Sequence, residues 1–269
     1  NDALALLAPA SAPRSTIPIL THCAIETDNG KITLTTTDLD CSVSITMPVG
    51  GGHQDASACI PLKELQAMAK DAKPKRKGDD NQCIVECEGD SATLHAMGTK
   101  KTIAARPKTD WPELRDVAEG AAVLEVEARD MLKALDSVSF AMSSEETRYY
   151  LQGAYLHAHE GEARFVATDG HRMAVYDTID SLDLEEGVII PRETVALFQK
   201  ALRYCVKKAG KHTLKNVQLS IEPDRVALQV VMASQPHGAL MRDIPVHLPK
   251  SSPDIAHRLV TGTLIDGVR

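Results

Sequence analysis

Hydrophobic residues recur along the chain with two spacings, one typical of helices and one typical of strands. Apolar positions three and four residues apart predict amphipathic helices at 3–10, 61–72, 129–142 and 191–202. Alternation of apolar and polar residues predicts strands at 83–87, 92–96, 123–128, 217–221 and 225–230. Short turns separate strand 83–87 from 92–96 and strand 217–221 from 225–230, so we expect each of these two pairs to form a hairpin.

The chain contains one pattern twice. Residues 20–45 align without a gap on residues 151–176, at a constant offset of 131, and Thr37-Asp38 falls on Thr168-Asp169. On both sides of the shared Thr-Asp pair, apolar residues of one copy align with apolar residues of the other. An internal repeat of this length indicates two copies of one structural unit.

Each copy reads as a helix, a hairpin with a glycine in its turn, a helix that opens with Ile-Pro, and a second hairpin. Proline suits the first helical position, because its missing N–H has no helical partner there. Two amphipathic helices packed on an antiparallel sheet give an α+β fold. We therefore expect tandem α+β domains at 1–121 and 122–269, with the boundary in the small and polar stretch RDVAEGAA.

Two segments depart from the repeat. The second copy opens with the strand at 123–128, whereas the first copy starts within its helix, so we expect the first strand of that copy to be missing. Residues 233–256 resemble an insertion in the last hairpin. Four prolines in this insertion favour an ordered or polyproline-II-like loop over strands.

Composition narrows the class of protein. Hydrophobic residues make up 43% and aromatics only 3%, so the cores must be mainly aliphatic. A formal charge of −7 argues against a broad basic surface, but not against basic residues gathered on one face. The sequence has no apolar run of membrane-spanning length and no visible signal peptide. Its six cysteines form no C-x-x-C pair, which favours reduced thiols in a cytoplasmic protein.

Positive charge gathers near the end of the second helix in both copies. The first cluster is Lys70, Lys73, Lys75, Arg76 and Lys77, and the second is Lys200, Arg203, Lys207, Lys208, Lys211 and Lys215. Cations favour the C-terminal end of a helix dipole, but the dipole accounts for only one or two of them. The repeated clusters therefore favour a surface that contacts phosphates without reading base sequence.

Candidate catalytic residues are few. The chain lacks a Gly-rich phosphate loop and a G-x-S-x-G elbow. His157 and His159 lie on one face of a predicted strand and could hold a metal with Asp169 or His171, although two solvent-facing histidines are the simpler interpretation. Asp169 could also orient His171 as a general base. The first copy keeps Thr-Asp without His-Arg, so a turn-forming role for Thr-Asp fits both copies.

Several motifs in order resemble one family. The segment ATDGHRMAVY (167–176) closely resembles the signature of the bacterial DNA polymerase III beta subunit, the DNA sliding clamp. Other resembling segments, in the family's order and spacing, are RSTIPIL (14–20), LTTTDLD (34–40), WPEL (111–114), FAMSSEETRYYLQGAYL (140–156) and VIIPRETV (188–195). The resemblance covers nearly the whole chain.

This resemblance implies tandem clamp domains whose helices line the inner wall of a ring. The family's activity is that of a non-catalytic processivity factor, which encircles duplex DNA and tethers the replicative DNA polymerase. Its partners would be double-stranded DNA, DNA polymerase and clamp-loader subunits that carry short peptide motifs, and a second copy in a homodimer. No cofactor, metal or membrane is implied. The third domain of the family is expected to be absent from this sequence.

The resemblance also assigns residues. The partner-peptide pocket of the family falls on Leu151, Thr168, Gly170, His171, Arg172 and Met173, where Met173 replaces the usual leucine and keeps an apolar wall. Its DNA contacts fall on Arg14, Tyr149 and Tyr150. The helix-end clusters add Lys73, Lys75, Arg76, Lys77, Lys200, Arg203, Lys207 and Lys208 as expected DNA-binding residues.

Two other functions stay open at this point. The chain could be a clamp-derived, two-domain module that binds partner peptides without closing a ring. It could also be a metal-dependent hydrolase that uses His157, His159, Asp169 and His171.

Overall fold

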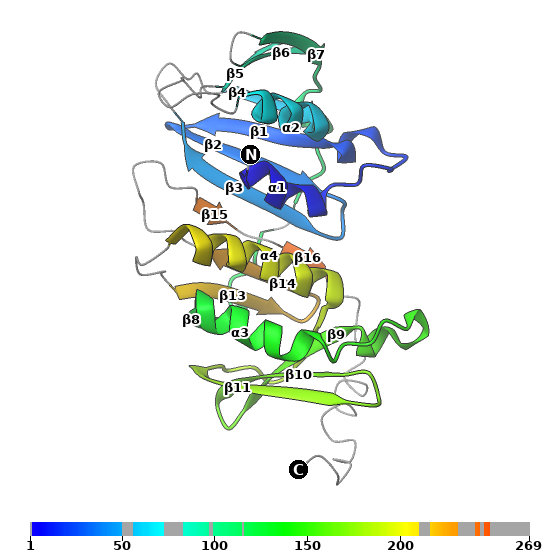
Figure 1. The fold of residues 1–269 in the computed structure, drawn as a ribbon. Coiled ribbons are helices and arrows are strands. Elements are labelled where there is room, and N and C mark those ends of the chain that lie inside the picture. Colours follow the sequence, from blue (N-terminus) through cyan, green and yellow to red (C-terminus); the bar gives the residue numbers. More distant parts are fainter. Residues whose placement is uncertain are drawn as a thin grey trace. The chain divides into compact units, whose positions relative to one another are not determined.

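The computed structural model describes residues 2–49, 56–72, 83–96, 99–114, 116–209, 216–230, 240–242 and 245–247 (Figure 1). These residues form two compact units. Unit 1 holds residues 2–114 together with the short strand β15, and unit 2 holds residues 116–230 together with the short strand β16. Both units combine helices with antiparallel strands, which confirms the predicted α+β class.

The described residues of unit 1 form two α-helices and two groups of strands. One group has the order β4-β1-β2-β3-β15 and the other the order β5-β6-β7. The elements are α1 (Asp2–Leu7), β1 (His22–Asp28), β2 (Lys31–Thr37), β3 (Ser42–Pro48), β4 (Ala56–Pro61), α2 (Leu62–Asp71), β5 (Cys83–Glu88), β6 (Ser91–Ala96), β7 (Thr99–Ala104) and β15 (Leu240–Arg242), with 3₁₀ turns at Ala8–Ala10, Pro18–Thr21 and Lys108–Asp110.

Unit 2 repeats this plan with longer helices. Its strands have the orders β11-β10-β9-β12 and β8-β13-β14-β16. The elements are β8 (Ala122–Glu127), α3 (Ala128–Ser139), the 3₁₀ turn η4 (Glu146–Leu151), β9 (Gly153–His159), β10 (Glu162–Thr168), β11 (Met173–Ser181), β12 (Val188–Pro191), α4 (Arg192–Ala209), β13 (Asn216–Glu222), β14 (Arg225–Val230) and β16 (Pro245–His247).

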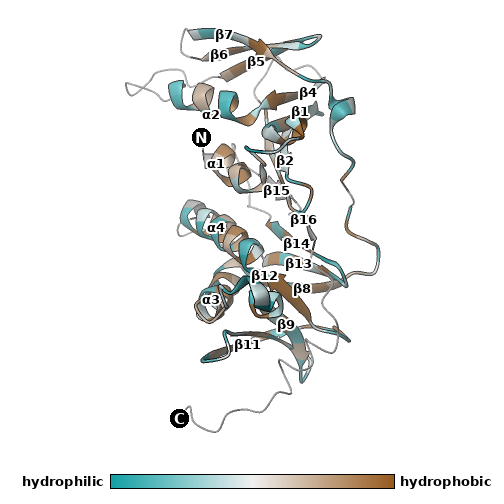
Figure 2. Ribbon diagram, turned by 90° about the vertical axis from the view of Figure 1, so that its right-hand side faces the viewer, coloured by the Kyte–Doolittle hydropathy of each residue, from teal (hydrophilic) through white to brown (hydrophobic). Residues whose placement is uncertain are grey.

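The helices of each unit lie together on one side of its strands (Figure 2). In unit 2, α3 and α4 pack against each other and bury the apolar stripes that the sequence predicted. Phe198 and Leu202 of α4 and Leu135 of α3 have no exposed surface. Burial of one such side chain contributes about 1.5–3 kcal/mol. The polar stripe of α4 is left on the surface.

The structure confirms the repeat to the residue. The bounds of β1 and β9, and those of β2 and β10, differ by the offset found in the sequence. The turns between them also match: Asn29 and Gly30 have φ of 48° and 75°, and Glu160 and Gly161 have φ of 54° and 85°. Two consecutive residues with positive φ are typical of the two-residue turn that follows the twist of a hairpin.

Two details of the sequence prediction were wrong. Pro61 and Pro191 do not open the helices but end β4 and β12, and the helices begin one residue later. Both are edge strands, where the missing N–H removes no hydrogen bond of the sheet. The insertion was expected to lack strands, yet residues 240–242 pair with β3 and residues 245–247 pair with β14. The rest of 233–256 lies outside the described residues.

The first residues of unit 2 are held by the adjoining ends of β13 and β14. Arg225, only 2% exposed, donates from Nη1 to the carbonyl oxygen of Asp116 at 2.7 Å. The backbone N–H of Ala118 donates to the buried Glu222 carboxylate at 3.0 Å. The predicted boundary after residue 121 stays a proposal, and these two bonds favour a boundary nearer residue 115.

Candidate functional site

The loop between β10 and β11, residues 168–172, is fixed by its own side chains. Thr168 Oγ1 donates to the carbonyl oxygen of Arg172 at 2.7 Å and accepts from the N–H of Gly170 at 3.1 Å. Asp169 Oδ1 accepts from the N–H groups of His171 and Arg172 at 2.9 and 3.0 Å. Gly170 has a φ of 88°, a conformation that glycine adopts without strain.

Unit 1 builds the same loop from a different sequence. Thr37 Oγ1 donates to the carbonyl oxygen of Cys41 at 2.8 Å, and Asp38 Oδ1 accepts from the N–H groups of Asp40 and Cys41 at 3.1 and 2.7 Å. Leu39 stands where the other loop has glycine and has a φ of 83°. The turn-forming role predicted for Thr-Asp is therefore confirmed in both copies.

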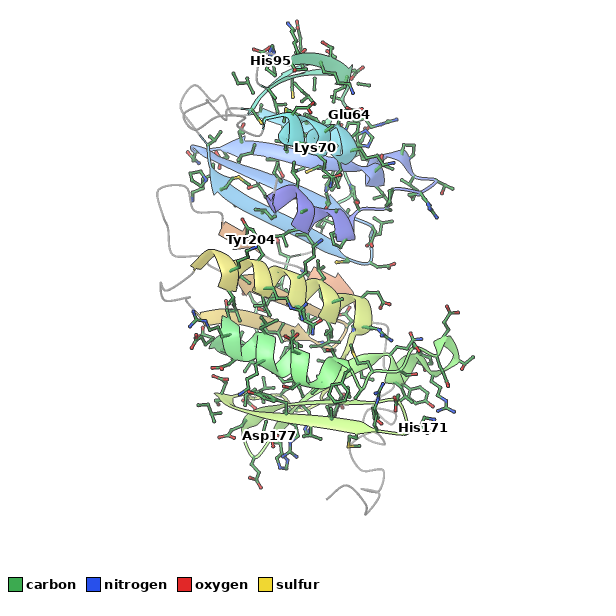
Figure 3. The ribbon with its side chains drawn as sticks, viewed as in Figure 1. Glu64, Lys70, His95, His171, Asp177 and Tyr204 are labelled. Atoms are coloured by element: carbon green, nitrogen blue, oxygen red, sulfur yellow. The ribbon has the colours of Figure 1, made fainter. Side chains whose placement is uncertain are left out.

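The loop of unit 2 presents three consecutive side chains to solvent. His171, which Figure 3 labels, is exposed, as is Arg172, and Met173 is 44% exposed at the first position of β11. Arg172 Nε donates to Asp169 Oδ2 at 2.9 Å, and its guanidinium lies 5.7 Å from the centre of the exposed Phe140 ring. The loop thus combines a fixed backbone with an imidazole, a cation and an apolar side chain.

The turn η4 lies against this loop. A side chain added at Gly170 would meet Nη1 of Arg148 at 3.4 Å, and η4 ends at Leu151, which is 7% exposed. Of the residues predicted for a peptide pocket, five are thus consecutive or nearly so in one loop. The sixth, Leu151, is a buried support within the neighbouring turn. Whether these residues bind a peptide stays a prediction.

The carboxylate of Asp169 accepts hydrogen bonds from the loop backbone and from Arg172 Nε, and its orientation of the His171 imidazole stays a prediction. Hydrogen bonds from the N–H groups of His171 and Arg172, followed by the Arg172 guanidinium, lower its pKa to about 2 from an ordinary value of 3.8. Asp169 therefore has a structural function in the loop.

The predicted histidine pair is only half exposed. His159 is solvent-facing, but His157 is 8% exposed, so that half of the expectation was wrong. The His157 ring stacks on Tyr155 with 5.0 Å between centres, and burial lowers its pKa. Among the described residues, no three His, Cys, Asp or Glu side chains are arranged to hold a metal ion.

Helix α4 carries a stripe of cations on its polar face. Lys200, Arg203 and Lys207 are exposed at a spacing of three and four residues, which sets them on one side of the helix. Arg203 Nη2 is 2.6 Å from Asp136 Oδ1 of α3, a contact that the sequence did not predict. The side chain of Lys208 is outside the described residues, as are Lys73, Lys75, Arg76 and Lys77.

The other expected DNA contacts lie in short turns. Arg14 is exposed in the turn before Pro18–Thr21. Tyr149 is 51% exposed, and its ring meets that of Tyr150 edge to face at 5.6 Å. Tyr150 packs against the cluster of Tyr155, Val166 and Ile189. Both tyrosines belong to the 3₁₀ turn η4, and their contact with DNA stays a prediction.

Two broader expectations bear on the class of protein. Every cysteine lies among the described residues, and all six are free thiols. In the part of the chain that the structure describes, no helix has the length and apolarity needed to cross a membrane.

Comparison with known proteins gives one consistent result. Residues 125–232 match the family described as DNA polymerase III beta subunit, central domain. The beta sliding clamp of Caulobacter vibrioides is 27% identical over 230 residues, which is 80% of this chain and 56% of the relative. That of Haemophilus influenzae is 26% identical over 183 residues, 68% of this chain and 48% of the relative. The chain thus spans about half the length of the curated relatives it matches.

Solved structures agree with the sequence matches. A sliding clamp (DNA polymerase III subunit beta) from Bartonella birtlesii, bound to griselimycin, has a TM-score of 0.73 and 26% identity, over 90% of this chain and 61% of that one. The beta subunit from Thermotoga maritima has a TM-score of 0.69 over 92% of this chain and 63% of that one, and at 22% identity it supports the fold. These matches agree with the repeated fold: residues 125–232 match the central domain of the DNA polymerase III beta subunits, and the chain as a whole is similar to the bacterial sliding clamps.

Proposed function

We propose that the chain serves as a DNA sliding clamp, a processivity factor that encircles duplex DNA and tethers the replicative DNA polymerase. The observation that carries the proposal is the central-domain match over residues 125–232, which includes both the loop 168–172 and the cation stripe of α4. No reaction is needed for this activity. The protein would work in the cytoplasm, as a homodimeric ring around the chromosome or another replicon.

The cation stripe supports contact with DNA. Lys200 and Lys207 are compact charges on flexible stems, which can follow phosphates without fixing one register. Nonspecific contacts of this kind are weak and fall steeply with salt. A ring that is linked topologically to DNA needs no tighter grip, and weak contacts leave it free to slide.

The loop 168–172 supports contact with partner peptides. His171, Arg172 and Met173 are exposed on a backbone that side-chain hydrogen bonds already fix, so binding would order few further groups. Met173 offers a flexible apolar surface, which suits several related peptides. The partners would be DNA polymerase and clamp-loader subunits that present short motifs.

The test is fluorescence anisotropy with a labelled peptide that carries the clamp-binding motif of a DNA polymerase. We expect the chain to bind the peptide and griselimycin to compete with it, as the Bartonella birtlesii clamp binds that compound. A double variant, His171→Ala with Met173→Lys, should abolish binding. The matched control is Ile179→Lys, which adds the same charge at a 91% exposed position of the same strand and should leave binding unchanged.

Three outcomes would count against the proposal. If the chain bound no such peptide under any condition, the replication role would have to be withdrawn. If Ile179→Lys abolished binding as fully as the double variant, the pocket would not be at residues 168–173. Peptide binding without retention of the whole protein on circular duplex DNA would favour the module that does not close a ring.

A further inference from the structure

The cation stripe of α4 contains a carboxylate supplied by the neighbouring helix. Asp136 of α3 accepts from Arg203 Nη2 at 2.6 Å and from Gln199 Nε2 at 2.7 Å, both at Oδ1. Gln199 also donates to Ser139 Oγ at 3.2 Å. One oxygen of Asp136 therefore holds two side chains that are one helical turn apart on α4.

The Asp136–Arg203 contact lies at the surface. Its side chains are 43% and 57% exposed, so water and salt screen the attraction, and such a pair adds little to stability. A phosphate could replace the carboxylate, because a guanidinium binds both kinds of anion in the same geometry. The arrangement thus sets up a competition for Arg203 between Asp136 and an incoming phosphate.

Two lysines flank Arg203 along the exposed side of α4. Lys200 and Lys207 lie three residues before and four residues after Arg203 on the exposed side of α4. On α3, Lys133 lies with Nζ 5.7 Å from the centre of the Tyr176 ring. Arg203, whose planar fork would give the most localised phosphate contact in the stripe, is held by the Asp136 carboxylate.

We propose that Asp136 is a positioning residue that restrains Arg203 and so weakens the contact of α4 with the phosphates of duplex DNA. The inference rests on the proposed function, because it concerns the same DNA-facing surface. Its effect would be to replace one localised, bidentate phosphate contact by the diffuse attraction of the lysines. A clamp that must slide would benefit, since no single phosphate position would be preferred.

The restraint has a measurable magnitude. Each phosphate neutralised adds about 0.9 to the slope of log affinity against log salt for duplex DNA. When salt rises from about 50 to about 200 mM, a surface with one additional free arginine should therefore lose about 3.5-fold more DNA affinity than the parent surface loses. Asp136→Asn keeps an oxygen acceptor for Gln199 but removes the charge that competes with phosphate.

The experiment measures anisotropy of a labelled short DNA duplex over this salt range. We expect the Asp136→Asn variant to bind the duplex more tightly than the parent chain. The slope of log affinity against log salt should be steeper by about 0.9, so the gain in affinity should be about 3.5-fold larger at about 50 mM than at about 200 mM salt. Asp130→Asn removes the same charge in the first turn of α3 and controls for net charge. In an Arg203→Gln background, the gain from Asp136→Asn should disappear.

The outcomes separate this inference from the proposed function. If Asp136→Asn behaved like Asp130→Asn, if it weakened binding, or if its gain survived Arg203→Gln, the restraint would be disproved. The DNA surface itself would fail a different test, in which Lys200→Gln with Lys207→Gln left the affinity and the salt slope of the parent chain unchanged. A melting curve for each variant shows whether the fold is retained.

Discussion

Replacement of Gly170 by alanine tests whether the signature loop needs its glycine for backbone geometry. Gly170 has a φ of 88°, and a Cβ atom added there would have Arg148 Nη1, at 3.4 Å, as its nearest neighbour. That distance is an ordinary van der Waals contact with the end of a flexible side chain. The substitution therefore changes backbone preference with little steric conflict.

The expected loss of stability follows from two opposing terms. A residue with a Cβ atom in the left-handed region costs about 1–2 kcal/mol relative to glycine. Alanine also reduces the entropy of the unfolded chain, which returns about 0.4–1 kcal/mol. We therefore expect Gly170→Ala to lower the free energy of unfolding by about 1 kcal/mol, and to weaken peptide binding because the loop then opens more often.

The assay is urea denaturation followed by far-UV circular dichroism and by tryptophan fluorescence. The single tryptophan, Trp111, packs against the core cluster of unit 1, so its fluorescence reports that unit. The loss of stability should shift the unfolding transition seen by circular dichroism, whereas the transition seen by Trp111 fluorescence should keep its midpoint. The matched control is Gly161→Ala, where φ is 85° and nothing lies within 4 Å of the added atom.

We expect Gly161→Ala to cost the same stability and to leave peptide binding unchanged. The reasoning would be refuted if Gly170→Ala left stability unaltered while Gly161→Ala lowered it. It would also be refuted by a loss above about 3 kcal/mol, since that would require a clash or a lost buried contact, neither of which is present at this position.

Three further predictions concern single groups. Because the folded-state pKa of Asp169 is about 2 and its ordinary value is 3.8, the stability that it contributes is present above pH 3.8 and is lost as the pH falls toward 2. The difference in unfolding free energy between the parent and Asp169→Asn should shrink over that range. Arg225→Met removes the donor to the Asp116 carbonyl and should cost about 1–3 kcal/mol, with faster proteolysis at residues 116–121; unchanged proteolysis would argue against the restraint of this segment. In a thiol titration of the native chain, the exposed Cys83 and Cys87 should react first, while burial raises the thiol pKa and blocks access for Cys23, Cys59 and Cys205.

The sequence alone determined the repeat and the elements that carry it. Periodicity of apolar residues identified each helix, and the offset of 131 located both central hairpins, because turn geometry and side-chain alternation are local properties of the chain. The Thr-Asp loop was also predictable, since a hydroxyl and a carboxylate bond to N–H groups two or three residues away. Both copies keep Thr-Asp, whereas only the second copy has His171 and Arg172. The comparison of the copies therefore indicated that Thr-Asp forms the turn and that His171 and Arg172 have another role.

Only the tertiary structure decided which side chains share a surface. Asp136 and Arg203 are far apart in sequence and come together because α3 packs on α4, so neither the periodicity nor the charge clusters indicated their contact. His157 is buried because of the face of the sheet on which it lies. Residues 240–242 and 245–247 form strands because the edges of β3 and β14 are available for pairing, which no local sequence pattern reveals. Local preferences fix elements within a few residues, whereas burial and pairing depend on which distant segment arrives beside them.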